Sequence, residues 1–243
     1  MVDIHCHILP GFDDGAPDLA EALTMARMGA DSGVTEILVT PHFHGEEESL
    51  ASLPTLYSRF RQLEEAVARE RLPLRLHPGA EILCLPETLD LAAKKQLPTL
   101  GRTDYVLCEF YFDTPFARMD MLLEGIADCG YKPVVAHPER YGAIQREPGR
   151  VEYWFRRGYV IQLNKGSVLR AFGSRVQDTA RWILDRGLAH VIASDAHRAD
   201  RRTTDMSRLR RYLLDRYPES YVQLLLRRNP GRLVQGRDMV RPD

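Results

Sequence analysis

Long apolar runs are absent from this sequence of 243 residues. No stretch of about 18 apolar residues occurs, so we expect no transmembrane helix and no insertion into a membrane. The N-terminus also has no recognisable signal peptide, and a motif with two histidines begins at His5, where cleavage of a leader would remove it. We therefore expect a cytoplasmic protein.

Cysteine is rare and forms no C-x-x-C pair. Of the four cysteines, Cys84, Cys108 and Cys129 lie in apolar stretches, and Cys6 lies between two histidines. Such positions are typical of buried thiols in a reducing compartment, and they argue against a structural zinc site rich in cysteine.

An excess of one charge is missing as well. Lysine and arginine together number 33, aspartate and glutamate 34, and the net charge is −1. No global field therefore favours nucleic acid or a membrane surface as a partner. Because the sequence has no G-x-G-x-x-G and no Walker A motif, nothing indicates a dinucleotide or P-loop site either.

What the sequence does contain is an ordinary globular composition, with 44% hydrophobic and 28% charged residues. No repeat, low-complexity tract or long linker divides it. The length suits one α/β-barrel domain or two small domains, and we expect a single domain over residues 1–243.

Short apolar runs alternate with amphipathic stretches along the chain, a pattern typical of parallel strands covered on both faces. The clearest helix is capped by Asp18, which has capping-box spacing to Glu21, and is stopped by Gly33. The expected strands are Val2–His5, Thr35–Thr40, Leu74–Pro78, Tyr105–Glu109, Pro133–His137, Tyr159–Leu163 and Ala189–Ser194. The expected helices are Asp18–Ser32, Pro54–Arg69, Pro86–Lys95, Phe116–Cys129, Pro148–Arg157, Ser174–Arg186 and Asp205–Tyr217.

Each expected strand leads to an imidazole, a carboxylate or an amide. In a β/α barrel the carboxyl ends of all strands open onto one face, which carries the chemistry. An open doubly wound sheet would spread the same side chains along a line, so we favour the barrel. The side chains in question are His5, His7, His42, His44, Glu81, Glu109, His137, Asn164, Asp195 and His197.

Imidazoles and carboxylates without a thiolate suit Mn, Fe or Zn ions. Side chains alternate along a strand, so His5 and His7 can share an ion while Cys6 points to the opposite side. Neighbouring metal ions lower the pKa of bound water toward ~7 and clamp the oxygens of an in-line displacement, which favours hydrolysis of phosphate esters. Arg140 follows His137 closely enough to bind the phosphoryl group, although it could instead pair with Glu139.

Five motifs together resemble those of a known superfamily. They are H-C-H-I-L-P-G-F-D-D-G near the N-terminus, T-P-H at 40–42, G-A-E at 79–81, H-P-E-R-Y at 137–141 and S-D-A-H at 194–197. In this combination the chain resembles the polymerase and histidinol phosphatase (PHP) superfamily. Within it, the chain is similar to the bacterial manganese-dependent protein-tyrosine phosphatases of capsular and exopolysaccharide systems. The resemblance covers nearly the whole chain, as far as Asn229–Pro230.

The resemblance implies an α/β fold, a distorted seven-stranded (β/α)7 barrel, with three Mn²⁺ ions. It implies that His5, His7, Glu81 and Asp195 hold the first ion and that Glu81, Glu109 and His137 hold the second. His42, His197 and an acid of the D-D-G turn would hold the third, and we narrowly favour Asp14 over Asp13 for that acid. Arg140 corresponds to the arginine that the family uses at the phosphate, and we expect His44 on the substrate side as well.

The resemblance also implies a substrate, phosphotyrosine on a bacterial tyrosine kinase that controls polysaccharide polymerisation and export. No cysteine is followed six residues later by arginine, so the C-x5-R loop of cysteine-dependent tyrosine phosphatases is absent. A tyrosine phosphatase with this sequence would have to use metal-activated hydroxide. The aromatic residues beside the predicted ligands either line a cleft for a phenyl ring or pack in the core; they are Phe43, Phe110, Tyr111, Phe112 and Tyr141.

Three other functions remain open. A small-molecule phosphomonoesterase of the same superfamily, acting on a substrate such as histidinol phosphate or a nucleotide, would use the same metals. A metal-binding scaffold without activity would regulate a kinase by binding it. Deacylation or deamination would need a base, and Lys165 is the only lysine placed to serve. The oligomeric state is also open.

Overall fold

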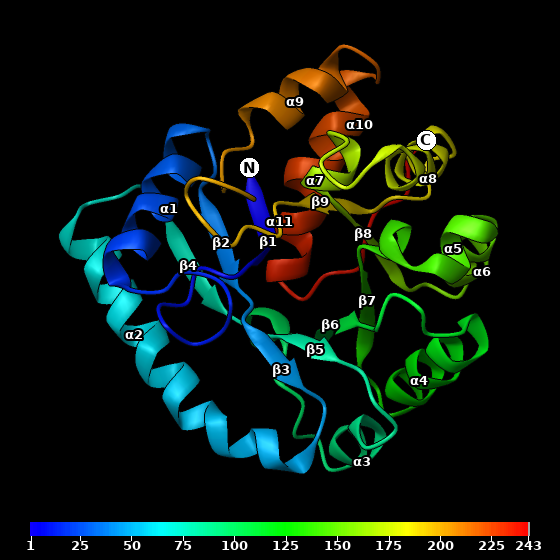
Figure 1. Cartoon of the computed structure of the whole chain (residues 1–243), viewed down its shortest axis with the longest axis horizontal. Helices are drawn as coiled ribbons and strands as arrows, with labels where there is room; N and C mark the ends of the chain where they lie inside the picture. Colours follow the sequence, from blue (N-terminus) through cyan, green and yellow to red (C-terminus); the bar gives the residue numbers. More distant parts are fainter. Residues whose placement is uncertain (243) are drawn as a thin grey trace.

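The computed structural model describes residues 1–242, in which nine strands form two parallel sheets (Figure 1). One sheet has the order β1-β2-β4 and the other the order β3-β5-β6-β7-β8-β9. The strands are β1 (Val2–Cys6), β2 (Glu36–Val39), β3 (His42–His44), β4 (Arg75–Pro78), β5 (Glu81–Leu83), β6 (Tyr105–Glu109), β7 (Lys132–Ala136), β8 (Val160–Asn164) and β9 (Val191–Ala193).

The expected α/β fold with parallel strands is confirmed, whereas closure into a seven-stranded barrel is not, and two of the expected strands are followed, after a break, by a further short strand. Thr40 and Pro41 separate β2 from β3, and Gly79 and Ala80 separate β4 from β5. Proline has no N–H to donate to a strand partner, so pairing stops there. The two broken strands still run side by side, since β2 pairs with β4 and β3 with β5, and the N–H of Glu81 donates to the carbonyl of Pro41 (3.0 Å).

Within the described residues neither sheet closes on itself, but β1 approaches the end of β9. Cys6 forms an isolated parallel bridge with Ala196. The N–H of Asp195 donates to the carbonyl of His5 (2.9 Å), and the N–H of His7 donates to the carbonyl of Ala196 (2.8 Å). The first and last strands therefore deliver their following residues to one place.

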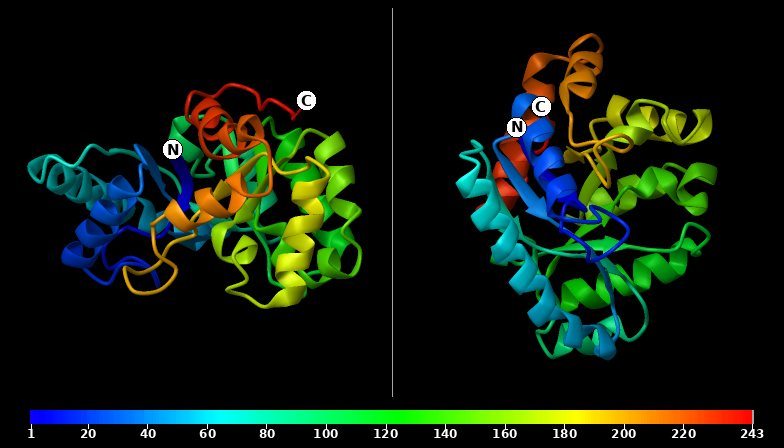
Figure 2. Two further views of the ribbon diagram at one scale, coloured as in Figure 1. Left: turned by 90° about the horizontal axis from the view of Figure 1, so that it is seen from above. Right: turned by 60° about the vertical axis from the view of Figure 1, so that its left-hand side comes forward.

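Most helices lie on the outer side of the strands, as the further views also show (Figures 1 and 2), whereas Leu233 of the last helix packs with strand residues on the inner side. The expected helices are present, with ends shifted by a few residues, and Asp18 caps the first of them by accepting from the N–H of Glu21. The α-helices are α1 (Leu19–Asp31), α2 (Leu53–Arg69), α3 (Thr88–Ala93), α4 (Phe116–Asp128), α5 (Gly142–Arg146), α6 (Arg150–Arg156), α7 (Lys165–Val168), α8 (Ser174–Asp185), α9 (Ser207–Leu214), α10 (Glu219–Gln223) and α11 (Asn229–Val234). Short 3₁₀ turns are η1 (Glu47–Ser52), η2 (Leu100–Arg102) and η3 (Pro138–Arg140), and η4 (Leu224–Arg228) is a π-helical turn.

The apolar residues of the strands divide between two faces. An outer cluster packs against the helices, and an inner cluster joins residues of six strands, among them Ile4, Leu38, Leu107, Val134 and Val191. This division explains the unbroken hydrophobic runs, because both faces of each strand are covered. Among the described residues, no helix is both long and apolar enough to cross a bilayer.

Candidate metal centre

Glu81 lies at the middle of a group of imidazoles. Its Oε2 is 3.2 Å from Nε2 of His5, 3.2 Å from Nε2 of His7 and 3.2 Å from Nδ1 of His42. Its Oε1 is 2.9 Å from Nε2 of His137. All of these residues are buried except His42, whose side chain is 32% exposed.

Strand register brings these residues together. His42 on β3 is directly beside Glu81 on β5, and Leu83, two residues further along β5, is beside Glu109 on β6. Side chains two residues apart on a strand point to the same face. The carboxylates of Glu81 and Glu109 therefore approach the same imidazole, with Oε2 of Glu109 at 3.5 Å from Nδ1 of His42.

A second group of ligand atoms forms around Asp14. Oδ1 of Asp14 is 3.4 Å from Nε2 of His42 and 3.4 Å from Nε2 of His197, and His7 completes a set whose ligand atoms all lie within 4.8 Å of one another. Asp13 faces another way. It pairs with Nδ1 of His7 (2.7 Å) and accepts from the N–H of His42 (3.0 Å).

His137 sits differently from the expected grouping with Glu81 and Glu109. Its Nε2 is close to Glu81 but 3.7 Å from Oε1 of Glu109, whereas His42, Glu81 and Glu109 form the compact set. His137 is nevertheless part of the same cluster, because its ring stacks on His5 with centroids 5.6 Å apart.

Asp195 connects the imidazoles to two arginines. Its Oδ1 lies 3.6 Å from Nε2 of both His5 and His7. Its Oδ2 receives Nη2 of Arg202 at 2.5 Å and Nη1 of Arg140 at 3.4 Å. The amide of Asn164 donates to the same Oδ2.

Two residues of the cluster have a left-handed backbone. His137 has φ 34° and Asp195 has φ 49°. This region is unfavourable for residues with a Cβ and persists where the surroundings enforce it, often at functional sites. In both cases the chain turns sharply after a strand, which directs the side chain into the cluster.

The Nδ1 atoms of three histidines have hydrogen-bond partners. Nδ1 of His5 lies 3.0 Å from Oε1 of Gln162, Nδ1 of His7 pairs with Asp13, and Nδ1 of His197 lies 3.1 Å from the carbonyl of Asp195. Such contacts fix the ring and leave Nε2 directed at the cluster, as around metal-binding histidines in general. Gln162 had no signal in the sequence, because glutamine within an apolar strand does not stand out.

The electrostatics of the cluster favour positive charge. Burial alone would lower the pKa of His5, but the carboxylates of Glu81 and Asp195 outweigh burial and raise it. Likewise burial opposes the charge on Glu81, yet the surrounding histidines hold its pKa well below the usual value.

The donor set fits divalent cations. Nε2 of His5 and Nε2 of His7 lie only 3.1 Å apart, and both face the same two carboxylates. Converging nitrogen lone pairs and carboxylate oxygens are the ligands that Mn, Fe and Zn accept. Three such sets of atoms occur among the described residues, and they share His7, His42 and Glu81.

Arg202 is a neighbour of the site that sequence reasoning missed. Its Nε also donates to the carbonyl of Asp195 (3.2 Å). The arginine-rich run Arg198–Arg202 directly follows S-D-A-H and could have drawn attention to it. Arg140 does not pair with Glu139, which is buried and accepts from the N–H of Asn164 (2.9 Å).

His44 is outside the cluster. It is exposed and lines a cavity of about 560 Å³ together with Asp14, His42 and Arg59. This cavity lies beside the second group of ligand atoms. His44 is therefore positioned next to the site and not within it.

The five aromatic residues beside the predicted ligands differ in their exposure to solvent. Phe43, Phe110 and Tyr141 are buried in the core, whereas Tyr111 and Phe112 are 58% and 47% exposed. Phe110 and Tyr141 therefore serve packing, Phe43 is buried at the wall of the cavity beside His44, and Tyr111 and Phe112 are the two that are exposed.

Lys165 is not positioned as a base for the cluster. It is buried, and its ammonium donates to the backbone carbonyls of Thr203 and Asp205. This placement counts against the deacylase or deaminase alternative.

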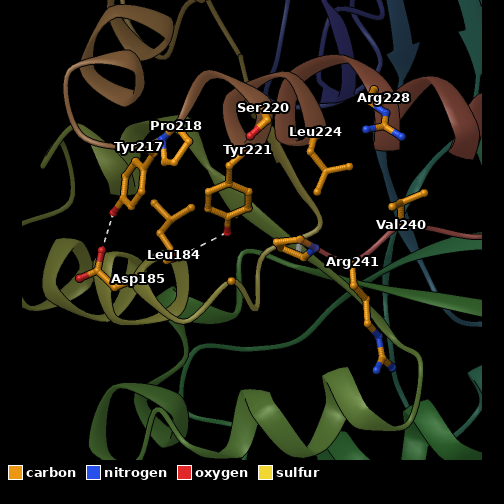
Figure 3. Close-up of a pocket in the computed structure, with 12 residues that line it drawn as sticks. Leu184, Asp185, Tyr217, Pro218, Ser220, Tyr221, Leu224, Arg228, Val240 and Arg241 are labelled. Atoms are coloured by element: carbon orange, nitrogen blue, oxygen red, sulfur yellow. Dashed lines mark hydrogen bonds between the residues drawn. The ribbon is translucent and has the colours of Figure 1, made fainter.

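A separate cavity of about 380 Å³ lies between α8, α10 and residues 240–242 (Figure 3). Tyr217 and Tyr221 line it. The hydroxyl of Tyr217 donates to the carboxylate of Asp185, and the hydroxyl of Tyr221 donates to the backbone carbonyl of Leu184. None of the predicted site residues lines this cavity.

Fold and site together define a parallel α/β protein with a centre suited to several metal ions at the ends of its strands. Residues 1–235 match the family described as "Capsular polysaccharide synthesis, CpsB/CapC", and the chain belongs to this family. The relationship expected from the motifs is thereby confirmed.

Individual relatives agree with the family. The chain is 33% identical to the tyrosine-protein phosphatase YwqE of Bacillus subtilis over 99% of its own length and 94% of that protein. A crystal structure from work on YwqE and Streptococcus pneumoniae CpsB, described as metal-dependent tyrosine phosphatases, matches with TM-score 0.88 at 31% identity, covering 100% of this chain and 97% of that one. A Listeria monocytogenes protein named as a candidate histidinol phosphatase matches with TM-score 0.53 at 11% identity, over 82% of this chain and 96% of that one, which shows a common fold only.

Proposed function

We propose that this protein is a metal-dependent phosphatase that hydrolyses phosphotyrosine. The observation that carries the proposal is the arrangement around Asp195, whose Oδ1 faces His5 and His7 while its Oδ2 faces the guanidinium of Arg140. One carboxylate thus links a cation-binding cluster to a group suited to phosphate oxygens. The relatives named as tyrosine phosphatases, which match almost the whole chain, support the same activity.

The proposed metal ligands keep the three sets implied by the family resemblance. The first set is His5, His7, Glu81 and Asp195, the second is Glu81, Glu109 and His137, and the third is Asp14, His42 and His197. The position of His42 near Glu109 allows it to assist the second set. Bound divalent ions would supply water of lowered pKa and would neutralise the charge of the phosphoryl oxygens. We propose Mn²⁺ as the metal, although Fe and Zn suit the same donors.

Arg140 is the residue that we assign to the phosphoryl group. Its Nη1 is 3.4 Å from Oδ2 of Asp195, which is long for an N–H···O contact, so its donors are available to a ligand. Arg202 and Asn164 hold Asp195 in place through the same oxygen. His44, beside the site, is proposed to contact the substrate next to the phosphotyrosine.

A protein substrate is proposed rather than a small molecule because part of the site is open. The side chain of Asp14 is 66% exposed. Tyr111, which follows Glu109 closely in the sequence, is exposed as well. A phosphotyrosine side chain projecting from a protein can reach such an open edge. Because the chain belongs to a capsular polysaccharide synthesis family, we propose a tyrosine kinase of that process as the substrate, with the reaction in the cytoplasm.

A cysteine nucleophile is not part of the proposal. Burial is the main cause that raises the pKa of the Cys6 and Cys84 thiols well above the usual value. A thiolate is the reactive form, so these residues are expected to be inert.

We also propose that residues 1–243 form one domain whose two sheets are the two arcs of a distorted seven-stranded barrel. The inner apolar cluster shared by six strands supports this arrangement. The bridge between Cys6 and Ala196 supports it as well, because it lies where the two arcs would meet.

Phosphate release from a tyrosine-phosphorylated peptide tests the proposed function. Metal-stripped protein is assayed with Mn²⁺, Fe²⁺ or Zn²⁺, and wild type is compared with His5→Ala and Arg140→Ala. We expect release that requires metal and that falls at least a hundredfold in both variants, about 3 kcal/mol of barrier. His77→Gln is the matched control, because His77 pairs with Glu36 (2.8 Å) instead of with the cluster.

Parallel assays separate the alternatives. Histidinol phosphate and nucleoside monophosphates are tested beside the peptide, and faster turnover of either would favour the small-molecule phosphomonoesterase. Protein that contains bound metal but releases phosphate from no substrate would favour the scaffold without activity.

A further inference from the structure

The guanidinium of Arg140 lies close to two phenyl rings. Its Cζ is 4.5 Å from the centre of the Phe112 ring and 4.5 Å from the centre of the Phe172 ring. Phe112 belongs to the segment after β6, Phe172 to the segment after α7, and Arg140 ends η3. Three separate parts of the chain therefore meet at this one side chain.

The backbone of Arg140 is fixed independently of the rings. Its N–H donates to the carbonyl of His137 (2.9 Å), and its carbonyl accepts from the side-chain amide of Gln145 (3.1 Å). The same amide also donates to the carbonyl of Glu139 (3.2 Å). The base of the side chain is thus held, while the direction of the flexible tip must be set by other contacts.

Asp195 alone does not set that direction. Its nearest approach to the Arg140 tip is the 3.4 Å contact of Nη1 with Oδ2, and this oxygen already receives Arg202 and Asn164. A single long contact leaves the plane of a guanidinium free to rotate. Two rings at equal distance restrict that plane, because an arginine cation is attracted to the face of an aromatic ring.

The exposure of Phe112 also calls for an explanation. Its side chain is 47% exposed beside the site, although a core position would bury it fully. Phe172 is partly buried, and the guanidinium of Arg202 also lies over its ring, with Cζ 5.9 Å from the centre. Both rings therefore have cations as neighbours, and Phe112 also lies beside the rings of Tyr141 and His137, with centroids 6.4 and 6.5 Å away.

We propose that Phe112 and Phe172 are positioning residues that hold the guanidinium of Arg140 in the orientation that binds a phosphoryl group. The inference rests on the proposed function, since it assigns these residues to the phosphate-binding half of that site. The ligand class is a tetrahedral oxyanion, either a phosphomonoester or inorganic phosphate. Holding the arginine in advance raises affinity, because less freedom is lost when the ligand binds.

The test combines two ring substitutions with removal of the arginine. Phe112→Leu and Phe172→Leu keep an apolar side chain but remove the aromatic face. Phe172→Tyr is a separate variant that keeps the aromatic face. Each is made in wild type and in Arg140→Ala. Binding of inorganic phosphate to the metal-loaded protein is measured by calorimetry, and KM and kcat are measured with a phosphotyrosine peptide.

Each leucine variant is expected to weaken phosphate binding about three- to tenfold and to raise KM with a smaller change in kcat. Phe172→Tyr should bind phosphate as wild type does. In the Arg140→Ala background neither leucine substitution should weaken binding further, because the cation that the rings hold is gone. Phe155→Leu is the matched control, since Phe155 also lies under an arginine, Arg241 at 4.8 Å, but away from the predicted site.

Other results would overturn the inference. Unchanged phosphate binding in both leucine variants would show that the rings do not position Arg140. A loss that persists in Arg140→Ala would mean that the rings act directly on the ligand or on the fold. If Phe112→Leu affected only phosphotyrosine and not inorganic phosphate, Phe112 would be a contact for the substrate ring. Turnover and phosphate binding are measured separately, so the two proposals can fail separately. Absence of turnover would contradict the proposed function but not the positioning role of the two rings. Absence of phosphate binding by wild type would contradict the positioning role.

Discussion

Asp13 and Asp14 are adjacent residues with different surroundings. Asp13 accepts hydrogen bonds from two backbone N–H groups, those of His42 and Gly15, and pairs with Nδ1 of His7. Burial would raise its pKa, but the contact with His7 outweighs burial and lowers the pKa of Asp13 to about 2. Asp14 is exposed and faces His42 and His197. The first residue therefore supports the loop, and the second is available to a cation.

This difference gives a prediction at the residue scale. Asp14→Asn is expected to reduce metal content by about one ion per chain. Asp13→Asn is expected to keep the ions at saturating metal but to bind them roughly 10- to 100-fold more weakly, as for other partners of metal-binding histidines. Elemental analysis after dialysis against defined metal concentrations measures both effects, with the exposed Asp31→Asn as control. If Asp13→Asn lost the ion and Asp14→Asn kept it, the assignment would be reversed.

His190 gives a second prediction, concerning pH. Burial, with a smaller effect of Arg241, lowers its pKa to about 4, and its Nδ1 accepts from the N–H of Ile161 (3.0 Å). Between pH 6.5 and 4 the unfolded chain binds a proton that the folded chain does not. The free energy of unfolding should therefore fall as pH decreases through this window, by up to about 3 kcal/mol. Below pH 4 the contribution of His190 should no longer change with pH.

His190→Gln should remove that part of the pH dependence. Urea unfolding of metal-free protein at several pH values between 4 and 7.5 measures it, and His44→Gln is the control because His44 is exposed. Parallel curves for wild type and His190→Gln would contradict the assignment.

Most residues of the cluster stand out in the sequence, because imidazoles and carboxylates at strand ends are uncommon and fall in recognisable motifs. Asn164 was noted only as a strand end, and Gln162 and Arg202 were not foreseen as partners of His5 and Asp195. Such partners act through one hydrogen bond each, and their residue types are ordinary in a sequence. Only the three-dimensional arrangement identifies them.

At the scale of elements, the loop between β1 and α1 is fitted tightly over the strand end. A Cβ added to Gly15 would lie 2.0 Å from the carbonyl oxygen of His7 and 2.6 Å from its Cβ. The N–H of Ala16 donates to that same carbonyl (3.0 Å). From the other side, Arg59 on α2 donates to the carbonyls of Pro10 and Gly11. The glycine of the D-D-G motif therefore serves close packing, which brings Asp14 to the histidines.

Gly15→Ala is accordingly expected to displace this loop. Overpacking against backbone costs roughly 1–3 kcal/mol, and the ion held through Asp14 should be lost while the others remain. Thermal unfolding and metal content measure the two effects. Gly149→Ala is the control, since a Cβ there would contact nothing within 4 Å and the backbone is helical. Full metal content in Gly15→Ala would contradict the role of this loop.

The elements themselves were predictable from periodicity and caps, but the interruptions of two strands were not. Tyr105–Glu109 and the helix capped by Asp18 agree with expectation, because local residues decide them. The breaks at Pro41 and Gly79 depend on pairing between distant segments, and the hydrophobic pattern alone carries no information about where that pairing stops.

At the scale of the whole molecule, the cluster exists only in the folded chain, because it is assembled from segments that are distant in the sequence. Four buried or partly buried histidines, His5, His7, His42 and His137, surround the carboxylate of Glu81. Ligands that bind only the folded state stabilise it, by about 2.7 kcal/mol at 100 times the dissociation constant. Chelation should therefore lower the melting temperature by roughly 5–10 °C.

Thermal unfolding with a chelator and with excess Mn²⁺ measures this shift. His5→Ala should lose most of it, whereas Arg140→Ala should keep it, because the guanidinium is not a metal ligand. Equal melting temperatures with and without metal in wild type would contradict a metal centre formed by these residues.

Asp195 has one further consequence, which follows from its two oxygens. An ion bound at Oδ1 would draw charge from the carboxylate and loosen the contact of Oδ2 with Arg140, and phosphate bound to Arg140 would in turn leave more negative charge for the ion. Linkage requires the two effects to be equal in free energy. Product and cofactor should therefore retain one another, so that phosphate slows the escape of metal and scarce metal weakens inhibition by phosphate.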